Sequence, residues 1–266
     1  MKTRTGCATL LTLLFPVYSA FAVIVGTGTP NANNAAPSDD RGWSSMGQYA
    51  QYGAVYLGNG WFITAAHLGK HGTNVAFAGE TYAIDTDTWT DIHNEDNTRA
   101  DFRLLRITSP SAITRPGVPI NRKAIAVGTD VTMIGRGYDS QDPVHVPSQT
   151  RYYQDTGQAM KWGTNMIRSF DQRFQASGYT TRTFRTIFGS GVAQALDRDS
   201  GGGVFVYDSD QETYVLAGLM IAAALGSTGE EATDKYAVHG GPIRSWTQSV
   251  DLRHYADQIN AVISNP

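Results

Sequence analysis

A glycine-rich run in the second half of the chain carries a serine that could act as a nucleophile. Ser200 is preceded by Asp199 and followed by Gly201 to Gly203, after which an apolar segment begins at Val204. Glycines permit a tight turn and a close approach of a ligand to the backbone, and successive N–H groups in such a turn can converge on an anion. A serine hydroxyl is a poor nucleophile without a nearby base. The run alone fits a Gly-rich hairpin with a turn-capping serine equally well.

Among the histidines, His67 is the strongest candidate for that base. It follows an apolar run at residues 61–63 and the small residues Thr64 to Ala66, so its ring could reach into a cleft from a strand end. Taken alone, such a histidine is more often a core or surface imidazole. His71 lies four residues later, but no glutamate and no third ligand completes a zinc pattern. We therefore expect neither a metal nor a cofactor.

A histidine base works best when a buried carboxylate fixes its tautomer. Asp101 directly precedes the apolar positions of the run 102–107, so we expect it to be partly buried at the start of a strand. The alternative is an acid that only bonds to the backbone at that strand start. Several acids upstream, from Asp85 to Asp96, could hold a cation, but most acidic loops are simply solvated.

Short strands with turn signals dominate the rest of the chain. Residues 52–57 and 61–65 flank Asn59-Gly60 and predict a β-hairpin. Residues 109–119 contain three prolines and indicate a connection between two halves, and residues 138–150 indicate an exposed loop. Apolar residues at near-helical spacing predict a helix over 250–263. This pattern indicates a sandwich or a pair of barrels rather than a parallel α/β sheet. Further strands are expected at 73–84, 101–107, 127–137, near 173, and at 181–188, 204–207 and 214–224.

The first 22 residues have the composition of an export signal. Lys2 and Arg4 precede an apolar stretch at residues 8–17, and Ala20-Phe21-Ala22 forms a small-x-small cleavage site. An uncleaved membrane anchor is the alternative, because apolar residues continue to residue 25. We expect cleavage after Ala22 and a secreted or periplasmic protein without stable membrane insertion. The one cysteine, Cys7, would leave with the signal, so no disulfide would stabilise the mature protein.

Composition limits the classes of partner. The chain of 266 residues has 28 glycines, 17% charged residues and a formal net charge of −3. These values suit a β-rich globular protein, and the sequence contains no basic stripe, so we expect no nucleic-acid partner.

Three segments taken together resemble the chymotrypsin-like (trypsin-like, S1) serine endopeptidases, in their bacterial secreted form. They are Thr64-Ala65-Ala66-His67, Ala100 to Leu105 around Asp101, and Asp199-Ser200-Gly201-Gly202, in the order His, Asp, Ser. The resemblance implies two antiparallel six-stranded β-barrels and a C-terminal α-helix. It also implies a division into a signal peptide at 1–22, barrels at 23–115 and 116–250, and the helix at 251–266.

The resemblance also implies roles for particular residues. Ser200 would be the nucleophile, His67 the general base and Asp101 the orienting carboxylate, while the backbone N–H groups of Arg198 and Ser200 would form the oxyanion hole. Asp199 would pair with the N-terminal amine, for which the family's motif points to Ile24, one residue after the start that signal cleavage would create. The substrate pocket would contain Gln194, Ala195, Ile221, Ala222 and Ala223.

Some positions depart from the family's pattern. Arg198 replaces a usual glycine and Ile221 a usual serine, and Gln194 puts a neutral side chain where trypsin-like specificity has an acid. We expect a monomeric endopeptidase that cleaves proteins or peptides. Because Gln194 is neutral, we do not expect it to cleave the bond after Arg or Lys. The alternatives are a catalytically impaired protease-like binding protein and an esterase or acyltransferase on the same scaffold.

Overall fold

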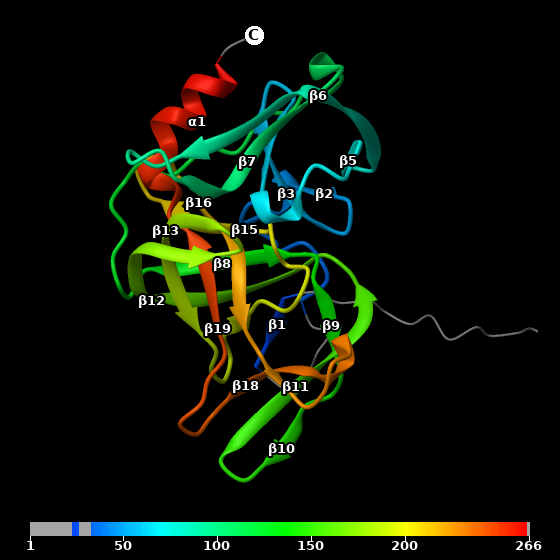
Figure 1. The fold of residues 1–266 in the computed structure, drawn as a ribbon, viewed down its shortest axis with the longest axis vertical. Helices are drawn as coiled ribbons and strands as arrows, with labels where there is room; N and C mark the ends of the chain where they lie inside the picture. Colours follow the sequence, from blue (N-terminus) through cyan, green and yellow to red (C-terminus); the bar gives the residue numbers. More distant parts are fainter. Residues whose placement is uncertain (1–22, 27–32, 265–266) are drawn as a thin grey trace, which may run out of the picture.

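The computed structural model describes residues 23–26 and 33–264, and the predicted signal segment 1–22 lies outside them. Two rings of six antiparallel strands lie one above the other in Figure 1, each closed into a barrel. Helix α1 (Ala256–Ile263) lies beside the upper ring. The predicted fold class, a pair of antiparallel six-stranded barrels with a C-terminal helix, is confirmed.

The first barrel has the strand order β2-β3-β4-β7-β6-β5. Its interior is aromatic, because Tyr56, Phe62 and Phe77 from three strands place their ring centroids 4.9–5.3 Å apart. Such contacts add to the burial of large apolar surfaces. The strands are β2 (Met46–Tyr49), β3 (Tyr52–Gly58), β4 (Trp61–Thr64), β5 (Asn74–Phe77), β6 (Glu80–His93) and β7 (Arg99–Ile107).

The hairpin between β3 and β4 follows local chemistry. Asn59 and Gly60 have φ values of 52° and 78°, and Gly58 pairs with Trp61 across the turn. Positive φ at both central residues matches the twist of adjoining strands, and Asn-Gly tolerates it best. The predicted hairpin is therefore confirmed.

The second barrel has the order β12-β13-β19-β16-β15-β8. One apolar cluster continues across the junction of the barrels, so Phe205 and Leu219 of the second barrel belong to the same core as the first. The strands are β8 (Asp130–Gly135), β12 (Lys161–Ala176), β13 (Tyr179–Ile187), β15 (Gly203–Asp208), β16 (Thr213–Ala224) and β19 (Trp246–Val250).

A third sheet lies below the second barrel in Figure 1 and corrects the prediction of an exposed loop at 138–150. That segment forms β9 (Tyr138–Ser140) and β10 (Val144–Val146), both paired with β11 (Gln149–Gln158). Strand β11 in turn pairs with β18 (Lys235–His239), which pairs with β17 (Gly226–Ser227). Strand β10 pairs with β11 across a two-residue turn, but none of its three residues is buried, so it has no apolar pattern that marks a strand.

Two short elements complete the framework. Strand β1 (Ile24–Val25) pairs with β14 (Ala193–Gln194), which brings the start of the described chain beside the segment that leads to Ser200. The predicted helix over 250–263 begins later than expected, because Val250 still pairs in β19 and residues 252–255 form a 3₁₀ turn before α1. Other 3₁₀ turns span Trp43–Ser45, Ala66–Leu68, Pro110–Ala112 and Ala232–Asp234.

Candidate active site

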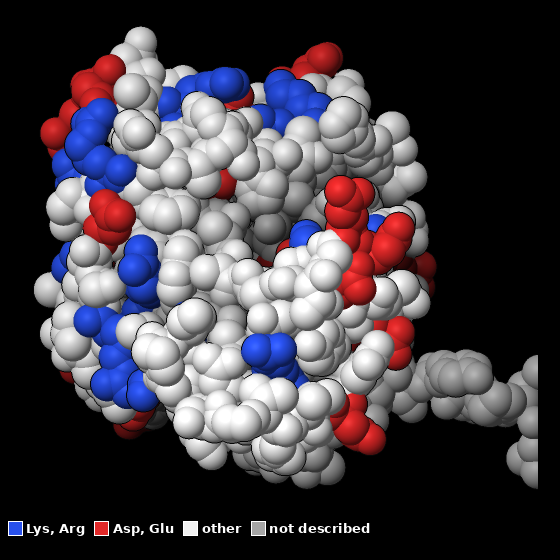
Figure 2. All heavy atoms as spheres, turned by 60° about the horizontal axis from the view of Figure 1, so that its bottom comes forward, with Lys and Arg blue, Asp and Glu red and all other residues white. Residues whose placement is uncertain are grey.

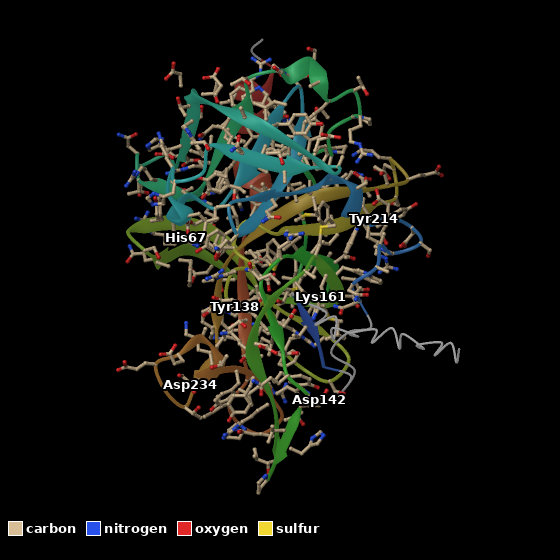
Figure 3. The ribbon with its side chains drawn as sticks, turned by 90° about the vertical axis from the view of Figure 1, so that its right-hand side faces the viewer. His67, Tyr138, Asp142, Lys161, Tyr214 and Asp234 are labelled. Atoms are coloured by element: carbon tan, nitrogen blue, oxygen red, sulfur yellow. The ribbon has the colours of Figure 1, made fainter. Side chains whose placement is uncertain are left out.

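His67 and Asp101 come from neighbouring strands of the first barrel. His67 lies in the 3₁₀ turn that follows β4, and the two small residues before it, Ala65 and Ala66, are buried. Asp101 lies in β7, the strand paired with β4, and only 1% of it is exposed. In Figure 3, His67 lies at the level where the upper barrel meets the lower one.

The structure brings His67, Asp101 and Ser200 together. Nδ1 of His67 lies 2.8 Å from Oδ2 of Asp101, and the backbone N–H of His67 donates to Oδ1 of the same carboxylate at 2.8 Å. On the other side of the ring, Nε2 lies 2.9 Å from Oγ of Ser200. With Nδ1 protonated, Nε2 can accept the serine proton, and the buried carboxylate can stabilise the imidazolium that forms.

The turn before β15 leaves two of its N–H groups available. Leu196, Asp197, Asp199, Gly201 and Gly202 each donate their backbone N–H to an acceptor. No acceptor among the described residues takes the N–H of Arg198 or of Ser200. Two unpaired donors beside the serine hydroxyl can stabilise the oxygen anion of a tetrahedral intermediate.

The turn itself is pressed against the first barrel. Gly201 has a φ of 78°, and a Cβ added there would lie 2.2 Å from the carbonyl oxygen of Gly53 in β3. The N–H of Gly53 donates to the carbonyl oxygen of Ser200 at 3.1 Å. Only glycine fits this close approach, which accounts for the glycine after the serine.

Arg198 adopts a conformation that side-chain-bearing residues usually avoid. Its φ is 73°, and left-handed backbone at a non-glycine residue costs on the order of 1–3 kcal/mol. Its guanidinium group lies 4.4 Å from the centre of the Tyr138 ring, and Nη1 donates to Oε1 of Gln51. Arginine thus takes a torsion that glycine would adopt without strain, with side-chain contacts offsetting part of the cost.

Asp199 is almost completely buried and fixes the base of the turn. Its carboxylate accepts the N–H groups of Leu196 at 2.8 Å, Gly137 at 2.7 Å and Val23 at 3.3 Å. Burial raises the pKa of Asp199 to about 7, although these three hydrogen bonds oppose the shift. The nitrogen at this carboxylate is that of Val23, not that of Ile24, to which the sequence motif pointed.

A second buried carboxylate and a lysine lie near Asp199. Nζ of Lys161 is 3.8 Å from Oδ1 of Asp139, and the lysine is fully buried. Burial lowers the pKa of Lys161 and raises that of Asp139. No sequence pattern predicted this pair, because Asp139 belongs to β9 of the unpredicted sheet.

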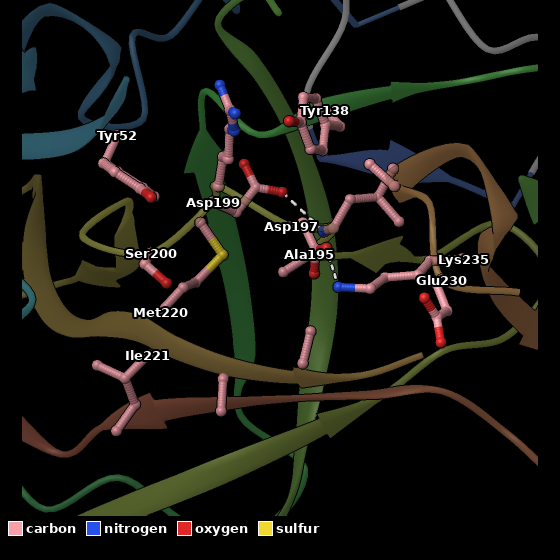
Figure 4. Close-up of a pocket in the computed structure, with 15 residues that line it drawn as sticks. Tyr52, Tyr138, Ala195, Asp197, Asp199, Ser200, Met220, Ile221, Glu230 and Lys235 are labelled. Carbon is pink, nitrogen blue, oxygen red and sulfur yellow. Dashed lines mark hydrogen bonds and ion pairs between the residues drawn. The ribbon is translucent and has the colours of Figure 1, made fainter. Parts of the chain in front are cut away.

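A cavity of about 560 Å³ lies next to Ser200 (Figure 4). Ala195, Ile221, Ala222 and Ala223, which the sequence assigned to the pocket, line it. Gln194 does not: it is fully buried, and its amide nitrogen donates to the carbonyl oxygens of Ala195 at 2.9 Å and Trp246 at 3.1 Å. Lining residues that sequence reasoning missed are Tyr52, Tyr138, Leu196, Asp197, Met220, Glu230, Ala232 and Lys235.

Three of these missed residues make the cavity polar. Lys235 of β18 places Nζ 2.6 Å from Oδ2 of Asp197, an ion pair drawn as a dashed line in Figure 4, and Glu230 lies on the same side of the cavity. Lys235 belongs to β18 of the third sheet, and Glu230 belongs to the loop that precedes β18. Their position beside Ser200 therefore depends on the non-local pairing of β18 with β11.

The acidic stretch upstream of Asp101 is engaged by arginines. Residues 85–93 belong to β6 rather than to a loop, and Asp91 pairs with Arg103 at 2.9 Å and with Arg99 at 3.6 Å. Asp96 pairs with Arg173 at 2.6 Å. In the part of the chain that the structure describes, no three His, Cys, Asp or Glu side chains gather in a way that could hold a metal ion.

Two surface properties bear on partners. Basic and acidic side chains are interspersed with uncharged ones on the face shown in Figure 2. Among the described helices, none has the length and apolar character needed to cross a bilayer.

Comparisons with known proteins agree with this architecture. The family model for trypsin matches residues 31–239 of the chain. The solved structure of neuropsin, a serine protease expressed in the limbic system of mouse brain, is 15% identical with a TM-score of 0.58, covering 87% of this chain and 98% of that one. An inactive form of Rv3671c from M. tuberculosis H37Rv is 13% identical with a TM-score of 0.50, covering 91% and 98%. A search of curated proteins found no significant sequence match.

Proposed function

The chain belongs to the trypsin family of serine endopeptidases, and from that membership we propose that it hydrolyses peptide bonds through an acyl-enzyme formed on Ser200. The observation that carries this proposal is the continuous hydrogen-bonded series from Asp101 through His67 to Ser200, with distances of 2.8 and 2.9 Å. A serine, a base and an orienting carboxylate in this relation form the arrangement used for acyl transfer.

In the proposed reaction, Oγ of Ser200 attacks the carbonyl carbon of the scissile peptide bond while Nε2 of His67 accepts the hydroxyl proton. The N–H groups of Arg198 and Ser200 bind the oxygen anion of the tetrahedral intermediate. His67 then gives its proton to the leaving amine, and the bond between the carbonyl carbon and nitrogen breaks. Water, deprotonated by His67, hydrolyses the acyl-enzyme in the same way, while the Asp101 carboxylate stabilises each imidazolium.

We further propose that export creates the active N-terminus. Cleavage after Ala22 would make the nitrogen of Val23 an α-ammonium group, and that nitrogen lies 3.3 Å from the Asp199 carboxylate. A buried carboxylate without a cation is costly, so this pairing would stabilise the turn that carries Ser200. The mature protein would then be a secreted or periplasmic monomer comprising the two barrel domains and the terminal helix, residues 23–115, 116–250 and 251–266.

For the side chain that precedes the cleaved bond, we propose a preference against Arg and Lys. The cavity beside Ser200 contains the cations Arg198 and Lys235, and the Asp197 carboxylate is already used in an ion pair with Lys235. Glu230 also lines the cavity, but it is exposed, so solvent screens its charge. A desolvated substrate cation without a carboxylate partner would be unfavourable.

The test is hydrolysis of a fluorogenic peptide library by the protein that starts at Val23. We expect cleavage within peptides and loss of at least about 10³-fold in kcat for Ser200→Ala, which removes the nucleophile. The control is Ser209→Ala, which changes an exposed serine. Equal rates for Ser200→Ala and the control would reject the proposal. Covalent reaction with esters but not with peptides would favour the esterase alternative. A folded protein that reacts with neither would favour the non-catalytic binding protein.

A further inference from the structure

The side chain of Arg198 is held from two directions. Gln51, which precedes β3 in the first barrel, accepts a hydrogen bond from Nη1, and the ring of Tyr138, at the start of β9, lies 4.4 Å from the guanidinium carbon. In the described part of the chain, no carboxylate lies within ion-pair distance of this guanidinium group. The contacts therefore restrain the position of Arg198 without neutralising it.

Tyr138 also fixes the peptide plane that carries the Arg198 N–H. Its backbone N–H donates to the carbonyl oxygen of Asp197 at 2.8 Å. That carbonyl and the N–H of Arg198 belong to the same planar peptide unit, so fixing the oxygen on one side fixes the direction of the N–H on the other. Rotation of this unit would break the bond to Tyr138 and would change φ of Arg198 and ψ of Asp197.

Rotation would otherwise be favourable for the backbone. Arg198 has a φ of 73°, and a residue with a Cβ gains free energy by leaving the left-handed region. A glycine would have little such tendency. The side chain thus both creates the strain and, through Gln51 and Tyr138, provides the contacts that oppose its release.

We propose that Gln51 and Tyr138 are positioning residues that hold Arg198, and with it the peptide unit between Asp197 and Arg198, in the orientation that aims the Arg198 N–H at the substrate oxygen. The proposal rests on the proposed peptidase function, because the N–H is given the role of an oxyanion donor there. Loss of either contact should weaken binding of the transition state more than binding of the substrate, so kcat should fall with little change in KM.

The test compares two backgrounds, the parent and Arg198→Gly, with kcat and KM measured on one peptide amide and with active sites titrated by a fluorophosphonate. In the parent, we expect Tyr138→Leu and Gln51→Met each to lower kcat about tenfold, which is less than the 10²–10³-fold cost of removing a whole donor. Gln51→Glu keeps the acceptor and should keep kcat. Tyr207→Leu, which truncates an exposed tyrosine of β15, is the matched control.

In the Arg198→Gly background, the same two substitutions should change kcat by less than about twofold, because no side chain remains to be held. Equal losses in both backgrounds would show that Gln51 and Tyr138 act on substrate directly, and no loss in the parent would show that they do not position the turn. Either result overturns the proposal. A parent protein that neither reacts with the fluorophosphonate nor cleaves peptides would instead reject the proposed function.

Discussion

Replacing Asp101 with asparagine tests how the carboxylate directs the histidine. The backbone N–H of His67 donates to Oδ1 at 2.8 Å, so an amide at position 101 must place its oxygen there. Its NH₂ group then occupies the Oδ2 position, 2.8 Å from Nδ1 of His67. Because the NH₂ group is a donor, Nδ1 becomes the acceptor and the ring carries its proton on Nε2.

This change of tautomer disables the base. The Nε2 proton would face Oγ of Ser200 at 2.9 Å, so the ring could no longer accept the hydroxyl proton. In serine proteases with this arrangement the same substitution lowers kcat about 10⁴-fold, equivalent to about 5.4 kcal/mol of transition-state stabilisation. We expect a loss of that order in kcat for a peptide amide, with KM within about threefold of the parent.

The assay is steady-state hydrolysis by the protein that starts at Val23, with thermal unfolding monitored in parallel. Asp251→Asn is the matched control, because Asp251 is equally buried and lies beside another histidine, with Oδ2 3.3 Å from Nε2 of His254. It should lower stability and leave kcat per folded molecule within about threefold. A value of kcat for Asp101→Asn within about tenfold of the parent would refute the reasoning about the tautomer.

Three further outcomes are expected. N-terminal sequencing of the exported protein should give Val23, and a protein made to start at Ile24 should lose at least about tenfold in kcat, because its amine falls one residue short of Asp199; equal activity of the two proteins would contradict this pairing. Burial raises the pKa of Asp199 to about 7 against about 4 in an unfolded chain, so urea denaturation of full-length Ser200→Ala should show stability falling as the pH rises from about 5 to about 7.5. The same variant starting at Val23 should lose much less stability over this range, since its α-ammonium group favours the ionised carboxylate, and parallel profiles would argue against the pairing. Peptides with Arg or Lys before the cleaved bond should show kcat/KM at least about 10²-fold below the best apolar or small side chain in a library, and faster cleavage after the basic residues would contradict our account of the cavity.

Local chemistry accounts for what the sequence predicted well. The Asn59-Gly60 turn needs only two residues that tolerate positive φ, and the apolar runs of β4 and β7 identify buried strands without reference to the rest of the fold. The placement of His67 and Asp101 follows from these strands being neighbours. The order of the three segments then suggested the family, and family membership supplied the double barrel.

Non-local pairing accounts for what the sequence did not predict. Strand β10 has no buried residue and therefore appears as a loop in the sequence, and the sheet that contains it is completed by β18, far along the chain. The same pairing brings Lys235 and Tyr138 to the cavity, so neither residue could be assigned to the site beforehand. The contacts of Arg198 with Gln51 and Tyr138 likewise join segments from both barrels and the third sheet.

The most direct test of the central claim is the site of covalent modification by a fluorophosphonate, determined by peptide mass spectrometry on the protein that starts at Val23. We predict a single adduct on Ser200, absent in Ser200→Ala and strongly slowed in His67→Ala. A folded protein that remains unlabelled, or that is labelled equally in Ser200→Ala, would contradict the account.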